Sequence, residues 1–315
     1  MYILGFDIGG TKCAALVAEW DGENVRVLDK VRLKTDTSIP ASEMIHRLID
    51  AADGILTKKP EAIGISSGGP LDSERGVIMS PPNLPGWDNV EIVGMMEGHY
   101  GVKARLLNDA NACAVAEWKF GAGRGTKNMV FLTFGTGLGA GLILDGRLYN
   151  GTNGNAGEVG HVRLDEDGPV GFGKAGSFEG FCSGGGIARL AWKMALDGVK
   201  NNTPPAYYRE GMTQSDVSAM TVAEAAKQGD VTALEVYRIS AERLGRGLAI
   251  IVDVLNPERI VIGSVFARSQ ELFLDTMQAV LKEEALSCAL DVCSVVPAQL
   301  GDSVGDYAAI AAALS

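Results

Sequence analysis

One glycine-rich segment occurs twice in this chain. Residues 4–16 read LGFDIGGTKCAAL and residues 130–142 read VFLTFGTGLGAGL. In each copy, an apolar run typical of a β-strand leads into a GGT or GTG turn, and a second run of small and apolar residues follows. Glycine has no Cβ, so such turns let backbone N–H groups come close to an anion. The repeat therefore predicts two phosphate-binding turns, one in each half of the chain.

The two copies together favour a nucleotide clamp more than either copy does alone. A single GGT turn is usually an ordinary hairpin turn, and this interpretation stays open for each copy by itself. The first copy has Asp7 before its turn and Lys12 beside it, which favours two turns that grip a triphosphate from two sides. Neither copy is a Walker loop or a dinucleotide fingerprint, because GxxxxGK[ST] is absent and a strand-like run follows each turn.

The composition is that of a globular protein with room for two domains. The chain has 315 residues, 46% of them hydrophobic and 21% charged. Its net charge of −11 opposes binding to nucleic acid and to anionic membranes. The segment MYILGFDIGG lacks the basic and long apolar regions of a signal peptide, so we expect a cytoplasmic protein. The five scattered cysteines fit buried thiols better than disulfides or a zinc cage.

Strand-like and helix-like segments alternate along the chain, which predicts an α/β fold. Asp88 and Glu91, three residues apart, predict a capping box for a helix that ends near Gly101. Pro257 is expected to end a long amphipathic helix. The strands are expected as three runs within residues 1–34 and at 61–67, 102–107 and 259–263. The other helices are expected at 40–56, after 108, at 231–255, at 269–286 and from 303 onward.

Four motifs together resemble the ROK family of sugar kinases. They are DIGGTK at 7–12, NDANACAVAE at 108–117, FGTGLGAGL at 134–142 and GNAGEVGH at 154–161. The resemblance runs from residue 2 to about 190 and resumes at 253–263 and 300–314. It implies a two-lobed α/β fold of the actin/hexokinase-like (ribonuclease H-like) type, with ATP and Mg²⁺ in a cleft between the lobes. The small lobe would comprise 1–115 and 301–315, the large lobe 116–300, and the protein would be a homodimer.

Asp109 is the candidate catalytic base. It lies in NDANA, where a strand-like run ends and a helix begins, a position that projects a carboxylate into a cleft. The local sequence alone favours a helix N-cap at this residue, whereas the resemblance favours the base. Phosphoryl transfer has a loose transition state, so the base mainly orients the hydroxyl and takes its proton late. An ordinary ionised Asp is sufficient for this role.

The resemblance also implies which residues bind the two substrates. Those expected to bind the sugar are Gly69, Asn83, Asn108, Asp109, Glu158, His161 and Glu179. Those expected to bind ATP are Asp7, Gly9, Gly10, Thr11, Lys12, Gly135, Thr136, Gly137, Gly139 and Gly263. Asp7 would also position Mg²⁺ through water, and Lys12 would offset phosphate charge. From the local sequence alone, Asn83 would be an exposed loop residue, His161 a structural residue, and Asp7 and Lys12 surface charges.

The chain departs from the family pattern at two places. The family's usual GG is replaced by Gly263-Ser264. The family's CxCGxxGCxE segment, whose cysteines hold a structural zinc with the His, here reads VGFGKAGSFE. The cysteine positions hold Val170, Phe172 and Ser177, and Cys182 lies beyond them, so we expect no zinc. We expect the rings of Phe172, Phe178 and Phe181 to be buried where the metal would stand, so that Phe172→Ala would cost roughly 3–5 kcal/mol.

The expected function is ATP-dependent phosphorylation of glucose or a related hexose, at the 6-hydroxyl. The missing zinc motif leaves open a catalytically weak sugar-binding member of the family, or a kinase for an N-acetylhexosamine or a rarer hexose. The family also contains sugar-sensing repressors, which carry a helix-turn-helix domain before the first glycine turn. That turn begins near residue 7 here, which disfavours a repressor. The sequence does not identify the sugar, because long-range folding builds the wall near its C2 and C4.

Overall fold

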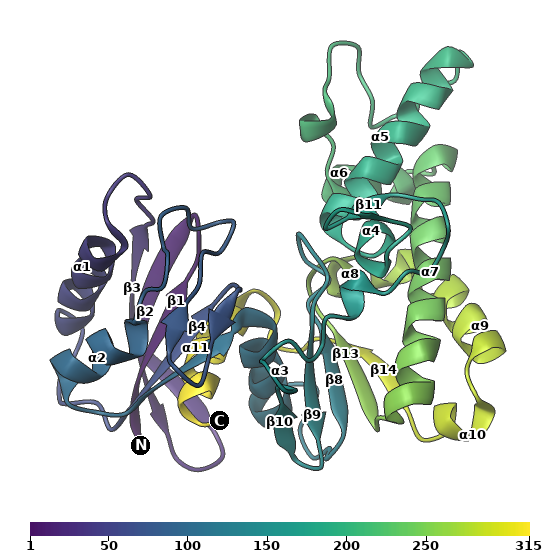
Figure 1. Cartoon of the computed structure of the whole chain (residues 1–315). Coiled ribbons are helices and arrows are strands. Elements are labelled where there is room, and N and C mark those ends of the chain that lie inside the picture. Colours follow the sequence, from purple (N-terminus) through teal and green to yellow (C-terminus); the bar gives the residue numbers. More distant parts are fainter. The chain divides into compact units, whose positions relative to one another are not determined.

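The structure is a computed structural model that describes all residues 1–315 and divides into two compact units (Figure 1). The first unit comprises Met1–Lys127, Gly141–Ala156 and Gln299–Ser315. The second comprises Asn128–Ala140 and Gly157–Ala298. Each unit is therefore assembled from segments that are distant in the sequence. The lobe boundaries expected from the sequence stay a prediction.

A five-stranded sheet forms the centre of the first unit. Its order is β3 (Val25–Lys34), β2 (Lys12–Trp20), β1 (Tyr2–Ile8), β4 (Ala62–Ser67) and β7 (Ala104–Asn108). The first three strands pair antiparallel, while β1, β4 and β7 run parallel with Ile8, Ser67 and Asn108 in register. Since the carboxyl ends of parallel strands meet at one edge, the residues that follow these three strands lie along the same edge.

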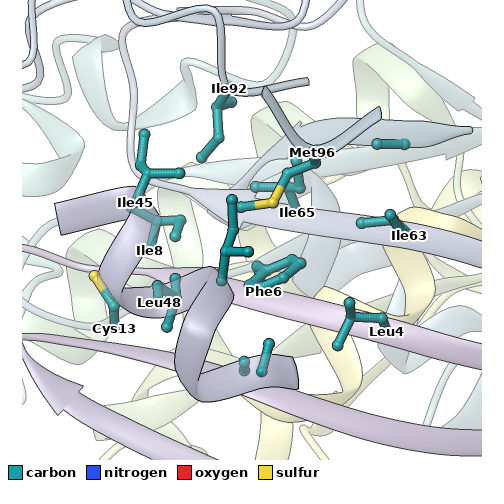
Figure 2. Packing of buried hydrophobic residues seen from close by; sticks show 14 of the residues in the cluster. Leu4, Phe6, Ile8, Cys13, Ile45, Leu48, Ile63, Ile65, Ile92 and Met96 are labelled. Carbon is teal, nitrogen blue, oxygen red and sulfur yellow. The ribbon is translucent and has the colours of Figure 1, made fainter. Parts of the chain in front are cut away.

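Side chains alternate along β1, so this strand contributes to a hydrophobic cluster on each face of the sheet. Leu4, Phe6 and Ile8 point into one hydrophobic cluster, which Figure 2 shows together with Ile45 and Met96. Ile45 lies in α1 (Ala41–Asp53) and Met96 lies in α2 (Ile92–Tyr100). On the other face, Ile3 packs with Ala309 and Ile310 of α11 (Val304–Ala313). The last helix therefore completes the core of the first unit.

The other elements of the first unit are shorter or lie at its boundary. The longest is α3 (Asp109–Phe120), which follows β7 directly. The remaining ones are β5 (Leu71–Asp72), β6 (Val77–Ile78), the hairpin of β9 (Ala140–Leu144) and β10 (Arg147–Tyr149), and the 3-10 turn η4 (Gly301–Ser303).

The second unit combines a parallel sheet with long helices. The strands β8 (Met129–Leu132), β13 (Arg259–Ile262) and β14 (Ser294–Pro297) run parallel. The longer helices are α5 (Gly184–Lys200), α6 (Ala219–Lys227), α7 (Val231–Leu255) and α9 (Leu274–Glu284). The short elements are η1 (Val159–His161), β11 (Val170–Gly171), β12 (Lys174–Ala175), α4 (Phe178–Phe181), η2 (Gln214–Asp216), α8 (Ser264–Arg268), η3 (Gln270–Leu272) and α10 (Ser287–Leu290). No helix has both the length and the apolar composition needed to cross a membrane.

Two local predictions about helices were wrong. The expected capping box is absent, because α2 has Glu91 as its N-cap without a side-chain bond, and the carboxylate of Asp88 instead accepts a hydrogen bond from the Ser80 hydroxyl. The helix expected at 269–286 is split into η3 and α9. The break falls at Phe273, which is fully buried against the rings of Phe134 and Tyr237. Tertiary packing of this ring overrides the local helical preference.

Candidate functional site

The first glycine turn lies directly after β1, at the carboxyl edge of the sheet. The Gly9 N–H donates to the Lys12 carbonyl oxygen at 3.1 Å, which closes the turn. A Cβ on Gly10 would lie 2.1 Å from the carbonyl oxygen of Asn83, so only glycine fits there. The structure thus brings the first predicted phosphate turn against the loop that holds a predicted sugar residue.

Three polar side chains surround two glycines that follow β4. A Cβ on Gly68 would lie 3.6 Å from Asn83 Nδ2 and 3.9 Å from Asp109 Oδ2. A Cβ on Gly69 would lie 3.1 Å from Asn108 Nδ2. We call Asn83, Asn108 and Asp109 the polar cluster; these three predicted sugar residues lie beside the pair Gly68 and Gly69. Gly68 is absent from the predicted set, although its place after a strand in ISSGG was an available signal.

Asp109 is the first residue of α3, but it is not the helix N-cap. Asn108 holds that position, and its Oδ1 accepts a hydrogen bond from the Ala110 N–H at 3.0 Å. Asp109 Oδ1 accepts a hydrogen bond from the same N–H at 2.8 Å, while its Oδ2 is the carboxylate oxygen that lies near Gly68. The Ala110 N–H thus holds one oxygen of the Asp109 carboxylate, and the other oxygen lies near Gly68.

Asp7 lies near the end of β1 in an acidic environment. Burial, together with the nearby charge of Asp306, raises the pKa of Asp7 from 3.8 to about 6, although Lys30 and Lys12 act in the opposite direction. Asp306 forms an ion pair with Lys30. A Cβ on Gly305 would lie 3.2 Å from Asp7 Oδ2, so glycine leaves room for this carboxylate. Carboxylate oxygens at such a position suit a Mg²⁺ held through water.

Asp306 and Lys30 are absent from the residues predicted from the motifs. Asp306 comes from α11, almost 300 positions away from Asp7 in the sequence, and only the packing of that helix on the sheet brings the two carboxylates together. The available signal was the acidic and glycine-rich segment GDSVGDYAA.

We expect Asp7→Asn to stabilise the ligand-free protein at neutral pH. A raised pKa means that the folded state holds this proton more strongly than the unfolded state, so stability falls as pH rises from about 4 through about 6. Asn cannot ionise, and the variant should gain about 1–3 kcal/mol at about pH 7.5 and nothing near pH 4. Urea denaturation at both pH values measures the free energy of unfolding of the wild type and of the variant. An equal loss of stability with pH in both proteins would contradict the assigned environment.

The second glycine turn connects β8 to β9. The Gly139 N–H donates to Thr133 Oγ1 at 2.9 Å, and the Thr133 N–H donates to the Gly139 carbonyl oxygen at 3.0 Å. Two amides at the start of α5 donate to carbonyl oxygens of the same turn. They are Gly184 N–H to Gly135 at 2.7 Å and Gly185 N–H to Thr136 at 3.2 Å. The start of α5 thus fixes the backbone of the turn.

Glu179 links the predicted sugar residues of the second unit to this turn. It lies in α4, and its Oε2 accepts a hydrogen bond from the Leu138 N–H at 3.0 Å. A Cβ on Gly137 would lie 2.7 Å from the same oxygen. A Cβ on Gly160 would lie 2.1 Å from the Leu138 carbonyl oxygen and 3.3 Å from the Glu179 Cβ. The EVGH segment and Glu179 therefore both pack on the turn.

Glu158 and His161 lie at the two ends of η1 and are exposed. The His161 ring meets the Phe172 ring edge-on, with 6.4 Å between centroids. Lys174 Nζ donates to the His161 carbonyl oxygen at 2.8 Å, which holds the following hairpin against this segment. Glu158, His161 and Glu179 thus belong to the second unit, whereas the polar cluster belongs to the first.

The segment that replaces the family's GG keeps a glycine-like backbone. Gly263 is the N-cap of α8, and Ser264 adopts a φ of 51°, in the left-handed region that favours glycine. A Cβ on Gly135 would lie 3.8 Å from Ser264 Oγ, so this hydroxyl lies beside the second glycine turn. The position predicted to contact the nucleotide is therefore close to the predicted phosphate turn.

The prediction that Phe172 is buried in place of a metal was wrong. The hairpin of β11 and β12 carries Phe172 at its tip with a φ of 41°, and the side chain is 83% exposed. The ring therefore lies outside the hydrophobic core. Phe178 and Phe181, in contrast, are 1% and 4% exposed, as predicted.

Ser177, at a cysteine position of the zinc motif, and Cys182, which lies beyond that motif, have structural roles. Ser177 is the N-cap of α4, and its hydroxyl accepts a hydrogen bond from the Gly180 N–H at 3.1 Å. Cys182 is buried, its Sγ donates to the Ser240 carbonyl oxygen at 3.4 Å, and burial raises the pKa of its thiol. No group of three or more His, Cys, Asp or Glu side chains is arranged to hold a metal ion. Elemental analysis of the purified protein would measure its zinc content.

A sequence profile of the ROK family matches residues 3–315. The chain belongs to the ROK family. A glucokinase from Thermotoga maritima is 30% identical over 96% of this chain and 94% of its own length. An N-acetylmannosamine kinase from Escherichia coli is 30% identical over 93% of this chain and 92% of its own length.

Solved structures of ROK proteins share the fold. A ROK hexokinase from Thermus thermophilus, 30% identical, matches with a TM-score of 0.80 over 100% of this chain and 98% of its own. A ROK glucokinase from Streptomyces griseus, solved with glucose and AMPPNP, is also 30% identical. It matches with a TM-score of 0.75 over 99% of this chain and 98% of its own. These likenesses confirm the two-lobed actin/hexokinase-like α/β fold predicted from the sequence.

Proposed function

We propose that this ROK protein transfers the γ-phosphate of ATP to the 6-hydroxyl of glucose or a related hexose, with Asp109 as the general base. It is a sugar kinase, the enzyme class to which its kinase relatives point. The observation that supports the detailed proposal is the polar cluster. It places one carboxylate and two amide side chains around a glycine pair at the carboxyl edge of a parallel sheet.

The polar cluster has the chemistry needed to hold a sugar hydroxyl. Amide groups donate and accept hydrogen bonds, so Asn83 and Asn108 can pair with vicinal hydroxyls. Asp109 would accept the hydrogen bond of the attacking hydroxyl and receive its proton late in the transfer. Gly69 leaves space for the sugar beside these groups, and Glu158, His161 and Glu179 would contribute further contacts from the second unit.

The two glycine turns would hold the phosphoryl donor. In this proposal Gly9, Gly10, Thr11 and Lys12 contact phosphates from the first unit, and Gly135, Thr136, Gly137, Gly139 and Gly263 contact the nucleotide from the second. The relative solved with glucose and AMPPNP supports this pair of substrates. A bound Mg²⁺ would offset the negative charge of the phosphates. Asp7 would hold it through water, a role that its carboxylate beside Asp306 fits.

A coupled assay with ATP and Mg²⁺ over glucose, mannose, fructose, allose and N-acetylmannosamine tests the proposal. We expect one hexose to show the highest kcat/KM, with glucose the first candidate. Phosphorus NMR of the product should place the new ester on the 6-oxygen. A protein that turns over none of these sugars, or that makes only a 1-phosphate, would contradict the proposal.

A kinase for an N-acetylhexosamine is the second candidate. The relative that acts on N-acetylmannosamine is as identical to this chain, at 30%, as the Thermotoga glucokinase. The same assay separates the two candidates through the ratio of kcat/KM for N-acetylmannosamine and glucose.

A homodimer and a cytoplasmic location, both expected from the sequence, complete the proposal. Light scattering after gel filtration tests the homodimer.

A further inference from the structure

Arg189 is a partly buried cation in the second unit without an acidic partner. Its Nε is buried and has no hydrogen-bond partner. Arg243 and Arg246 of this unit also have a buried Nε without a partner, but their side chains form ion pairs with Asp165 and Glu284, whereas Arg189 forms none. A buried donor without an acceptor destabilises the fold unless a ligand supplies the acceptor. A bound anion would supply this acceptor and would match the charge of the guanidinium.

The guanidinium lies over the first turn of α5. Side chains on a helix lean toward its N-terminus, so Arg189 reaches back over Gly185, four residues earlier. Its Nη1 and Nη2 atoms lie 3.1 Å and 3.6 Å from the point where a Cβ on Gly185 would stand. Because Gly185 has no side chain, the guanidinium fills this space.

The same turn of α5 contacts the second glycine turn. The Gly185 N–H donates to the Thr136 carbonyl oxygen at 3.2 Å, and the Gly185 Cβ position lies 3.1 Å from that oxygen. The Arg189 side chain therefore lies beside Thr136, a residue proposed to contact the nucleotide. The positive end of the helix dipole of α5 lies at the same place.

We propose that Arg189 binds a phosphate group of the phosphoryl donor held by the second glycine turn. This inference rests on the proposed kinase function. A guanidinium presents planar donors that match phosphate oxygens, and a phosphate oxygen would give the buried Nε its missing acceptor. ATP and inorganic polyphosphate share this chemistry, and the experiment below distinguishes them.

The test compares Arg189→Gln and Arg189→Lys with the matched control Lys193→Gln. Lys193 is exposed on the next turn of the same helix. We expect Arg189→Gln to raise the KM for ATP and the Kd of AMPPNP by about 10- to 100-fold. The KM for the sugar and the Tm should stay unchanged. Arg189→Lys should recover only part of the affinity, because an ammonium cannot bind bidentately, and Lys193→Gln should match the wild type.

Gly185→Ala offers a variant that keeps the charge. The added methyl group would displace the guanidinium, so the KM for ATP should rise by less than in Arg189→Gln.

Inorganic polyphosphate replaces ATP as donor in a parallel assay with the wild type and Arg189→Gln. A loss confined to ATP assigns the phosphate to the nucleotide, and an equal loss with both donors assigns it to a site for any polyphosphate chain; either result supports the inference.

Unchanged KM for ATP and unchanged AMPPNP affinity in Arg189→Gln would overturn the inference while the kinase function stood. Parallel losses in sugar KM and Tm would also overturn it, because they would show that Arg189 only supports packing. A wild-type protein that phosphorylates no sugar, but loses AMPPNP affinity through Arg189→Gln, would contradict the proposed reaction and still support the phosphate contact.

Discussion

Asp109→Asn is expected to lower kcat by about 10²–10⁴-fold. The carboxylate lies in the polar cluster, with Oδ2 next to Gly68 and Oδ1 held by the Ala110 N–H. Asn keeps the size and the hydrogen bond to this N–H but cannot accept the proton of the sugar hydroxyl. Steady-state kinetics with the best sugar of the panel measures the loss, and calorimetry should show that sugar and AMPPNP still bind.

The control for this variant is Asp36→Asn, a partly exposed carboxylate of the same unit whose partners are Ser38 and Arg47. It should retain the wild-type kcat. If Asp109→Asn retains more than about a tenth of wild-type kcat, Asp109 is not the general base, because such a group contributes at least about 10²-fold.

Phe178→Ala is expected to destabilise the protein by about 3–5 kcal/mol. The ring is 1% exposed and is inserted against α7 at Gly247, where a Cβ would lie 2.3 Å from the Phe178 Cζ. Truncation would leave a cavity between α4 and α7. Because α4 carries Glu179, the KM for the sugar should rise as well. Urea denaturation measures the free energy of unfolding.

Phe172→Ala is the matched control, the same substitution in the same segment. The ring is 83% exposed at the hairpin tip, so its removal should change the free energy of unfolding by less than about 0.5 kcal/mol. A cost for Phe172→Ala close to that for Phe178→Ala would show that the hairpin is packed in solution and would contradict its structure here.

Elements with a strong repeat in polarity could be predicted from the sequence. The helix expected at 231–255 is α7, and it ends at Asn256 in the left-handed conformation, directly before Pro257. The three strands expected in the first 34 residues are β1, β2 and β3. The break at Phe273 and the absent cap at Asp88 could not be predicted, because contacts with other elements decide both.

The sequence by itself determined the family, the α/β class and the two glycine turns, because these depend on motifs and on local periodicity. It also indicated Asp109 as the candidate base, because NDANA marks a junction of strand and helix. Only the tertiary structure decided that Phe172 is exposed while Phe178 is buried, and that Asp306 lies beside Asp7. The tertiary structure also decided that Arg189 lies beside Thr136. These features arise where segments far apart in the chain pack together, and no local pattern encodes which side chains then meet.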